Sequence, residues 1–141
     1  MPFKYFVRHA ERMPLVTARV RRFPTEDPEK VKRALLNIFP DALVEDYEGG
    51  YIARSGTLNR FKQLVRNQRI LDSTRKMLLR GASGNETSFR LNKQVAFVDK
   101  VSFVEERVPL GSIEVSVESE DLPSLINEVA PVTVNGEEVR T

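Results

Sequence analysis

Residues 15–40, LVTARVRRFPTEDPEKVKRALLNIFP, decide the fold class because they place a strand pattern directly before a helix pattern. A strand is expected over residues 15–23, because apolar and polar residues alternate from 16 to 21, as they do in a strand with one buried face. The helix pattern has Thr25 or Asp27 as its capping residue and Pro28 in its first turn, and it stops at Pro40. Its apolar positions recur at helical spacing and predict a buried stripe of Val31, Ala34, Leu35 and Ile38.

The rest of the chain alternates between strand patterns and turn signals. Residues 41–56 predict a hairpin around Gly49 and Gly50, and the Asn135–Gly136 dipeptide predicts a second hairpin near the C-terminus. Further strand patterns cover 87–91, 95–106 and 112–119, and a short helix is expected from Asp121. This order predicts an α+β fold, in which a mainly antiparallel sheet carries helices on one face.

Length and composition describe a globular chain. Its 141 residues suit one domain, with residues 1–14 as an N-terminal extension and residues 15–141 as the domain. Apolar residues make up 40 % of the chain and charged residues 30 %. No apolar run approaches the roughly 20 residues that span a bilayer, and the N-terminus lacks the apolar core of a signal peptide. We therefore expect a cytoplasmic protein without a membrane segment.

The residue types that carry most metal and nucleophile chemistry are scarce. There is no cysteine, and His9 is the only histidine. A zinc site built from several histidines and a catalytic triad based on histidine are therefore not expected. The segment GASGNETS, residues 81–88, lacks the Gly-Lys-Ser/Thr ending of a phosphate-binding loop. We expect a protein without a cofactor, a metal or catalytic activity.

Charge is sorted along the chain, although the net charge is only +2. Residues 1–100 hold 20 Lys and Arg against 11 Asp and Glu, whereas residues 101–141 hold 2 against 9. This distribution favours a polyanion as the partner of the basic part. The alternative is that the acidic third folds back and neutralises the basic part, and charge alone leaves both open.

Residues 61–80, FKQLVRNQRILDSTRKMLLR, carry the strongest functional pattern. We predict one long basic helix that starts after Thr57 and ends before Gly81. Five cations and Ser73 fall in one stripe at spacings of three and four residues: Lys62, Arg66, Arg69, Ser73, Lys76 and Arg80. Arg75 lies beside this stripe. The opposite side holds Leu64, Leu71 and Leu78.

A row of like charges at these spacings destabilises a helix, so the row indicates a partner outside the helix. Nucleic-acid phosphates are a natural partner because they bind such rows without needing a particular base sequence. The alternative is an acidic surface, in the same chain or in a neighbouring protein.

The segment after this helix, RGASGNETSFRLNKQ (residues 80–94), adds polar groups next to the stripe. Ser83 and Asn85 offer short polar side chains, while Gly81 and Gly84 let backbone N–H groups approach a phosphate. Arg90 and Lys93 add charge a few residues later. The alternative is a helix C-cap followed by a polar connection.

Aromatic residues are weaker candidates for RNA contact. Phe89, Phe97 and Phe103 lie in strand patterns where core packing is expected first, although a sheet face can also carry stacked bases. Tyr47 and Tyr51 flank the glycine turn. They can stack on bases, or they can simply pair across the hairpin.

Three stretches, PTEDPEKVKRALLNIFP, RNQRILDSTRKMLLRGASGNETSFRLNKQ and PLGSIEV, resemble an uncharacterised archaeal family described as predicted RNA-binding and exosome-subunit-like. The resemblance covers roughly residues 15–130. It implies an α+β fold similar to that of a large-subunit ribosomal protein of the type that binds 5S ribosomal RNA. It brings no catalytic residues. The matching positions that can contact RNA are Arg66, Arg69, Arg75, Lys76, Arg80, Gly81 to Asn85, and Lys93.

These observations lead to one hypothesis and two rivals. The hypothesis is a non-enzymatic RNA-binding protein that contacts structured RNA mainly through its phosphate backbone. The first rival is an assembly subunit, a homodimer or a complex component, whose basic face meets an acidic surface. The second rival is an enzyme for a small phosphate-bearing substrate, and it rests only on the segment around Gly84 and on Lys93.

Overall fold

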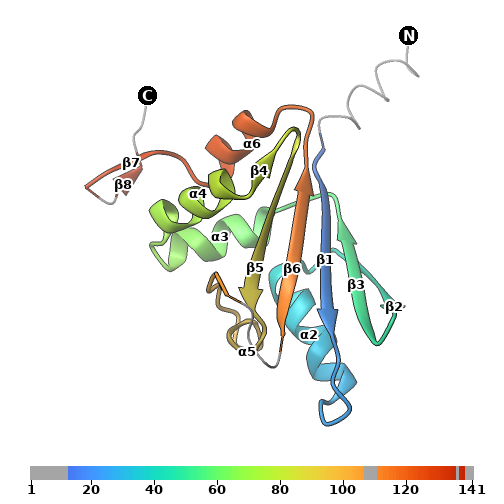
Figure 1. Ribbon diagram of the computed structural model, residues 1–141. Helices are drawn as coiled ribbons and strands as arrows, with labels where there is room; N and C mark the ends of the chain where they lie inside the picture. The colour runs from blue at the N-terminus through green and yellow to red at the C-terminus, as the bar shows by residue number, and fades with distance from the viewer. Residues whose placement is uncertain (1–12, 107–110, 136, 139–141) are drawn as a thin grey trace.

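The structure, a computed structural model, describes residues 13–106, 111–135 and 137–138 (Figure 1). Residues 1–12 of the predicted N-terminal extension, with His9, lie outside these ranges. The strands are β1 (Leu15–Arg21), β2 (Leu43–Tyr47), β3 (Gly50–Ser55), β4 (Ala82–Ser83), β5 (Glu86–Asn92), β6 (Ser112–Glu118), β7 (Thr133–Val134) and β8 (Glu137–Glu138). The helices are α2 (Pro28–Ile38), α3 (Asn59–Asn67), α4 (Leu71–Arg80), α5 (Lys93–Ala96) and α6 (Leu122–Val129).

Six strands form one sheet in the order β2-β3-β1-β6-β5-β4, and each neighbouring pair is antiparallel. The helices gather on one side of this sheet and leave the other side uncovered (Figure 1). The predicted α+β fold is therefore confirmed. This side matters for function because, among the described residues, no helix covers it and most of its outward side chains are partly or fully exposed.

The core lies between the sheet and the helices. The inward residues of β1, which are Val16, Ala18 and Val20, are at most 4 % exposed, as their alternation predicted. Helix α2 begins at the predicted place, where the Asp27 carboxylate accepts a hydrogen bond from the backbone N–H of Glu29. Its buried residues are the four that the helical spacing predicted: Val31, Ala34, Leu35 and Ile38. The three phenylalanines Phe61, Phe89 and Phe103 pack together with ring centroids 5.5–6.4 Å apart.

The predicted long basic helix is wrong, because the chain forms two helices, α3 and α4. Helix α3 ends in a Schellman motif: the N–H of Ile70 donates to the carbonyl of Val65, and the N–H of Arg69 donates to that of Arg66. The residue that must take the left-handed conformation there is Arg69, at φ 57°. The Gln68 side chain fixes this end by bonding to both the N–H and the carbonyl of Val101, each at 2.8 Å.

The strand predicted for residues 95–106 is also wrong. Residues 93–96 form the short helix α5, which the Asn92 side chain caps by accepting from the N–H of Val95. The Asn37 amide of α2 donates to the carbonyls of Ala96 and Phe97, so the turn after α5 is tied to the helix layer. Of the predicted strand, a single bridge between Phe103 and Leu91 remains.

Both predicted hairpins form. The turn between β2 and β3 uses Glu48 and Gly49 at φ 32° and 82°, which explains the need for glycine there. Strands β7 and β8 pair around Asn135, at φ 54°, while Gly136 lies outside the described residues. Among the described residues, every helix is too short or too polar to cross a lipid bilayer.

Candidate nucleic-acid interface

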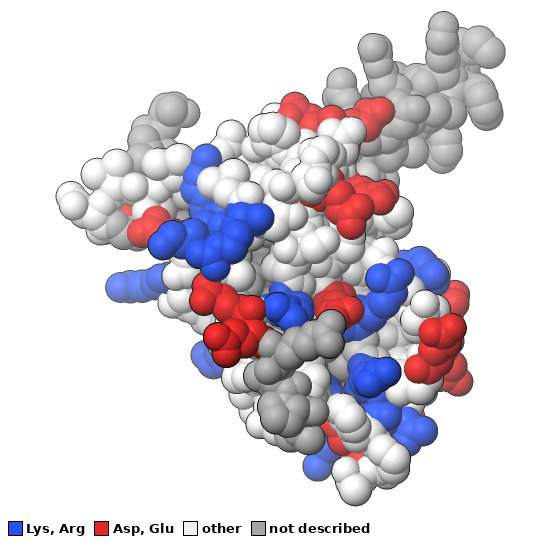
Figure 2. All heavy atoms as spheres, in the orientation of Figure 1, with Lys and Arg blue, Asp and Glu red and all other residues white. Residues whose placement is uncertain are grey.

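Lysines and arginines gather at two places, over α4 and over the lower part of the sheet face that Figure 2 shows. We call six cations of α3, α4 and the turn between them the helix surface: Lys62, Arg66, Arg69, Arg75, Lys76 and Arg80. We call the outward side chains of β1, β2, β3, β5 and β6 the sheet surface. No group of three His, Asp or Glu residues placed to hold a metal occurs within the described ranges.

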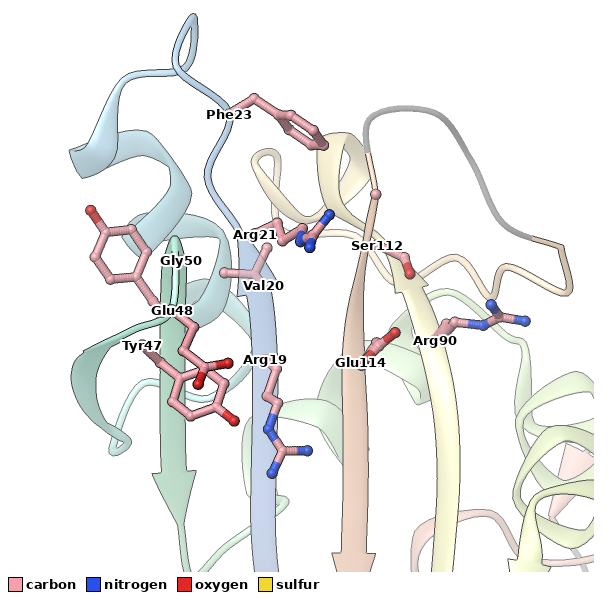
Figure 3. A pocket seen from close by; sticks show the side chains of 12 residues that line it. Arg19, Val20, Arg21, Phe23, Tyr47, Glu48, Gly50, Arg90, Ser112 and Glu114 are labelled. Carbon is pink, nitrogen blue, oxygen red and sulfur yellow. The ribbon is translucent and has the colours of Figure 1, made fainter.

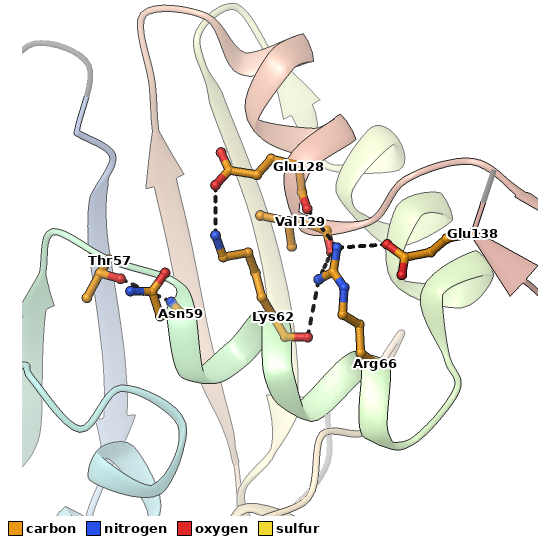
Figure 4. A network of polar contacts seen from close by, with 7 residues as sticks. All are labelled: Thr57, Asn59, Lys62, Arg66, Glu128, Val129 and Glu138. Carbon is orange, nitrogen blue, oxygen red and sulfur yellow. Dashed lines mark hydrogen bonds and ion pairs between the residues drawn. The ribbon is translucent and has the colours of Figure 1, made fainter. Parts of the chain in front are cut away.

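On the helix surface, Lys62 and Arg66 of α3 contact the acidic C-terminal third (Figure 4). Lys62 Nζ lies 2.8 Å from the Glu128 carboxylate. The Arg66 guanidinium reaches the Glu138 carboxylate at 3.1 Å and donates to the carbonyl oxygens of Glu128 and Val129. The alternative that the acidic third folds back onto the basic part therefore holds for these two side chains.

Arg75 of α4 plays a related role at the end of α6. Its guanidinium donates to the Asn127 side chain at 2.7 Å and to the carbonyl of Ala130 at 3.0 Å. The last carbonyls of a helix have no partner within the helix and carry partial negative charge. Arg66 and Arg75 supply donors and positive charge at that end, so they hold α6 in place.

The remaining cations of the helix surface are more accessible. Arg80 pairs with Glu105 at 2.7 Å, but both side chains are more than half exposed, and such pairs are worth about 0–1 kcal/mol. A phosphate can replace Glu105 at little cost. Arg69 and Lys76 are exposed and make neither an ion pair nor a side-chain hydrogen bond with any other described residue.

The segment after α4 is a β-hairpin rather than a phosphate-binding loop. Ser83 pairs with Glu86, and Gly84 at φ 61° and Asn85 form the exposed tip. A C′ position requires a left-handed backbone, but the backbone of Gly81 is right-handed. Its lack of a side chain serves close packing, since a Cβ there would overlap with the carbonyl oxygen of Ser88. Ser83, Gly84 and Asn85 therefore remain available to a partner.

Lys93 does not lie on the surface, contrary to the prediction that it contacts RNA. Its side chain is 1 % exposed, and Nζ donates to the Glu26 carboxylate and to the carbonyl of Arg21, both at 2.9 Å. Nζ also lies 5.0 Å from the centroid of the Phe23 ring. The ammonium thus ties the segment after β1 to the start of α5, and a phosphate cannot reach it in this conformation.

The sheet surface is polar and its charge is uneven. Arg19 lies opposite Glu114, which lies opposite Arg90 on the far strand. At the other end of the same strands, Glu86 lies directly opposite Glu118. In Figure 2, the upper part of the face carries acidic atoms, whereas the lower right carries basic atoms with further acidic atoms at its edge. A polyanion is therefore attracted to the end of the sheet where β1 ends.

A groove of about 510 Å³ lies at this basic end (Figure 3). Its side chains come from β1, β2, β5 and β6 and the adjoining turns, and they include Arg19, Arg21, Phe23, Tyr47, Glu48, Arg90 and Glu114. The Tyr47 side chain is 43 % exposed, and the Arg19 Cζ atom lies 5.8 Å from its ring centroid. Tyr51, the second tyrosine that flanks the turn, is only 6 % exposed, with Lys32 of α2 beside its ring, so its ring faces the helices.

Sequence patterns placed Arg90 among the candidate RNA contacts but not Arg19 or Arg21. Arg19 and Arg21 nevertheless alternate with the buried Val16, Ala18 and Val20 and therefore project from the other face of β1. The alternation does not reveal that no helix within the described ranges covers this other face.

This antiparallel sheet is backed by helices on one face and carries arginines on the other. Such a face is suited to contact with unpaired nucleotides, because it can present side chains to several bases at once. The model of a family described as RNA binding matches residues 15–119. The chain belongs to this RNA-binding family, together with archaeal UPF0201 proteins.

Two relatives show the extent of the match. A UPF0201 protein of Metallosphaera sedula is 40 % identical over 130 residues, which covers 86 % of this chain and 90 % of that protein. A UPF0200/UPF0201 protein of Archaeoglobus fulgidus is 38 % identical over 128 residues, which covers 89 % of this chain. The matched part spans only 40 % of the length of the Archaeoglobus protein.

Solved structures share the fold. The crystal structure of a UPF0201 protein from Methanococcus jannaschii matches with a TM-score of 0.79 at 37 % identity, over 90 % of this chain and 98 % of that chain. A DUF54 protein from Methanothermobacter thermautotrophicus matches with a TM-score of 0.59 at 20 % identity, over 84 % of this chain and 98 % of that chain. The second likeness concerns the fold alone.

Proposed function

We propose that this chain binds RNA and that it does so mainly through the phosphate backbone, without a catalytic step. The observation that carries the proposal is the basic end of the uncovered sheet surface, where Arg19 and Arg21 make no ion pair with any described residue. Guanidinium groups without an ion pair can release counterions from RNA without first breaking an ion pair in the protein. Membership of the RNA-binding family supports the same conclusion.

The exposed part of the helix surface extends this contact. Arg69, Lys76 and Arg80 are exposed, and the Glu105 that pairs with Arg80 also accepts a hydrogen bond from Arg90 through its carbonyl oxygen. The helix surface and the sheet surface therefore meet at Glu105. We assign phosphate contacts to Arg69, Lys76, Arg80 and Arg90. We assign sugar or backbone contacts to Ser83, Gly84 and Asn85.

The paired cations take a different role in this proposal. Lys62, Arg66 and Arg75 hold α6 and the β7–β8 hairpin, so they shape the surface rather than contact RNA directly. At these positions the rival hypothesis of an acidic partner protein is not needed, because the groups that pair with these cations lie within the chain. Contacts to phosphate carry no sequence information, so we expect affinity for many RNA sequences.

The test is the salt dependence of RNA affinity for matched pairs of variants. One variant changes Arg19 and Arg21 to alanine, a second changes Arg69 and Lys76 to alanine, and the control changes Lys30 and Arg33 to alanine. The control residues are exposed on α2, in the helix layer behind the sheet. Affinity for a labelled single-stranded RNA pool is measured by fluorescence anisotropy between about 50 and 300 mM salt.

Wild-type protein should give a log–log slope of several units. Each lost phosphate contact should flatten the slope by about 0.7 for single-stranded RNA. We therefore expect a slope that is shallower by about 1.4 for each of the two test variants and almost no change for the control. If all three variants lose the same amount, the cations act only through net charge, and the assignment of these surfaces is wrong.

A further inference from the structure

We propose that the groove at the basic end of the sheet holds one unstacked nucleotide of single-stranded RNA, with its base against Tyr47 and its phosphate at Arg21. This inference rests on the proposed RNA binding and adds a base-contacting site to it. A volume of about 510 Å³ lies within the range of about 300–1,000 Å³ that is typical of small-molecule sites.

The shape of the groove follows from the strand register. Tyr47 lies opposite Gly50, and Gly50 lies opposite Arg21, so all three belong to one row across β2, β3 and β1. Gly50 contributes no side chain, which leaves a gap between the tyrosine ring and the guanidinium. The gap is fixed, because a Cβ at Gly50 would overlap with the carbonyl oxygen of Val20. In this proposal a flat ring enters between Tyr47 and Arg21.

The walls of this gap suit a base. Aromatic side chains and guanidinium planes both stack on nucleobases, and here they occur together, with the Arg19 Cζ atom 5.8 Å from the Tyr47 ring centroid. Ile52 projects toward the same side as Arg19, its register partner, yet it is only 2 % exposed. The sheet face beside Arg19 is therefore apolar at this position.

The acids of the groove argue against a bare anion as the occupant. Glu48 and Glu114 line the same cavity as Arg19, Arg21 and Arg90, and Glu114 lies between two of these arginines in the strand register. Carboxylates repel free phosphate but accept hydrogen bonds from exocyclic amino groups, such as the one on cytosine. A nucleotide offers both chemistries, a phosphate for Arg21 and an amino group for a carboxylate.

The experiment compares single-stranded and double-stranded RNA of the same length, because paired bases cannot enter the groove. The test variant is Tyr47→Ala, and the rescue variant Tyr47→Phe keeps the ring but removes the hydroxyl. The matched control is Leu43→Ala, since Leu43 lies on the same face of β2, is 75 % exposed and lies outside the groove. Thermal unfolding of each variant checks that the fold is intact.

Stacking of one base corresponds to a change of about 5- to 150-fold in affinity. We expect Tyr47→Ala to weaken binding of single-stranded RNA within that range, with the salt slope unchanged and the double-stranded affinity unaffected. Tyr47→Phe and Leu43→Ala should both stay near wild type. If Tyr47→Ala behaves like Leu43→Ala while wild type binds RNA, the nucleotide site is overturned and RNA binding stands. If wild type binds neither RNA at the lowest salt, both proposals fall.

Discussion

The buried ion pair between Lys93 and Glu26 allows a quantitative prediction about the segment that borders the groove. The Lys93 side chain is 1 % exposed and that of Glu26 is 19 % exposed. Substituting Glu26 by alanine leaves an ammonium in the core that keeps only the Arg21 carbonyl as a hydrogen-bond acceptor. Breaking a buried pair in this way costs about 3–5 kcal/mol, so we expect Glu26→Ala to destabilise the protein by that amount.

The opposite substitution should cost less. In Lys93→Met, the Glu26 carboxylate keeps the hydrogen bond from the backbone N–H of Phe23, at 2.8 Å, and part of it reaches water. We expect a loss of about 1–3 kcal/mol. In the double variant no charge is left unpaired, so its loss should be smaller than the sum of the two single losses.

Urea unfolding of the four proteins measures these free energies. Thermal unfolding should show a shift of about 3–5 °C for each kcal/mol in a chain of this size. Equal losses for the two single variants, or strict additivity in the double variant, would refute the argument from burial. A Lys93→Met protein of wild-type stability that binds RNA more weakly would restore the prediction made from the sequence, in which Lys93 contacts RNA.

Three further substitutions test the structure away from the groove. Gly81→Ala should destabilise by about 1–3 kcal/mol in urea unfolding, because its methyl group would overlap with the Ser88 carbonyl, and an unchanged midpoint would contradict the close approach. Thr74→Val should stabilise by about 1–3 kcal/mol, because the buried Thr74 hydroxyl has no hydrogen-bond partner among the described residues; a loss of stability would reveal a hidden partner. The pKa of Asp121 lies below its usual 3.8 because it accepts hydrogen bonds from the Ser124 side chain and backbone. The stability that the Asp121 carboxylate contributes to the folded state is therefore present above pH 3.8 and is lost as pH falls through the lower pKa of the folded state. Asp121→Asn should remove this part of the pH dependence of unfolding, measured between about pH 2 and 5.

The elements that the sequence predicted are those whose signals are local. Asp27 and Pro28 start α2 and Pro40 ends its pattern, while Gly49 supplies the positive φ of the first hairpin. Each of these signals acts within a few residues of the structure it specifies. They could be found without knowing where the rest of the chain lies.

The two failures have a long-range cause. The break between α3 and α4 puts an arginine, Arg69, at the position where glycine usually marks a helix end, and the supporting contact comes from Val101, which is 33 residues away from Gln68. The apolar alternation of residues 95–106 suited a strand, but Asn92 and Asn37 bind the backbone of the turn instead. Neither contact leaves a trace in the local pattern.

Only part of the candidate site could be predicted from the sequence, because the rest depends on contacts between distant segments. Helical spacing identified the cations of α3 and α4 correctly as a basic group, yet it could not separate Arg66, which is occupied by α6, from Lys76, which is exposed. The outward position of Arg19 could be read from strand alternation. Its importance depends on which face the helices cover, and that is settled only when the layers pack.

The arrangement of charge explains why RNA contact should shift from the predicted stripe toward the sheet. The C-terminal third takes up the cations closest to α6, because the helix end attracts Arg66 and Arg75 and the glutamates attract Lys62. These contacts leave Arg69 and Lys76 on the helix surface and Arg19 and Arg21 on the sheet surface without an ion pair to a described residue. In the proposed RNA complex, a strand that avoids breaking the internal pairs would contact these four residues. The acidic third would thereby influence where a polyanion binds, since a phosphate would have to compete with it for the cations that it holds.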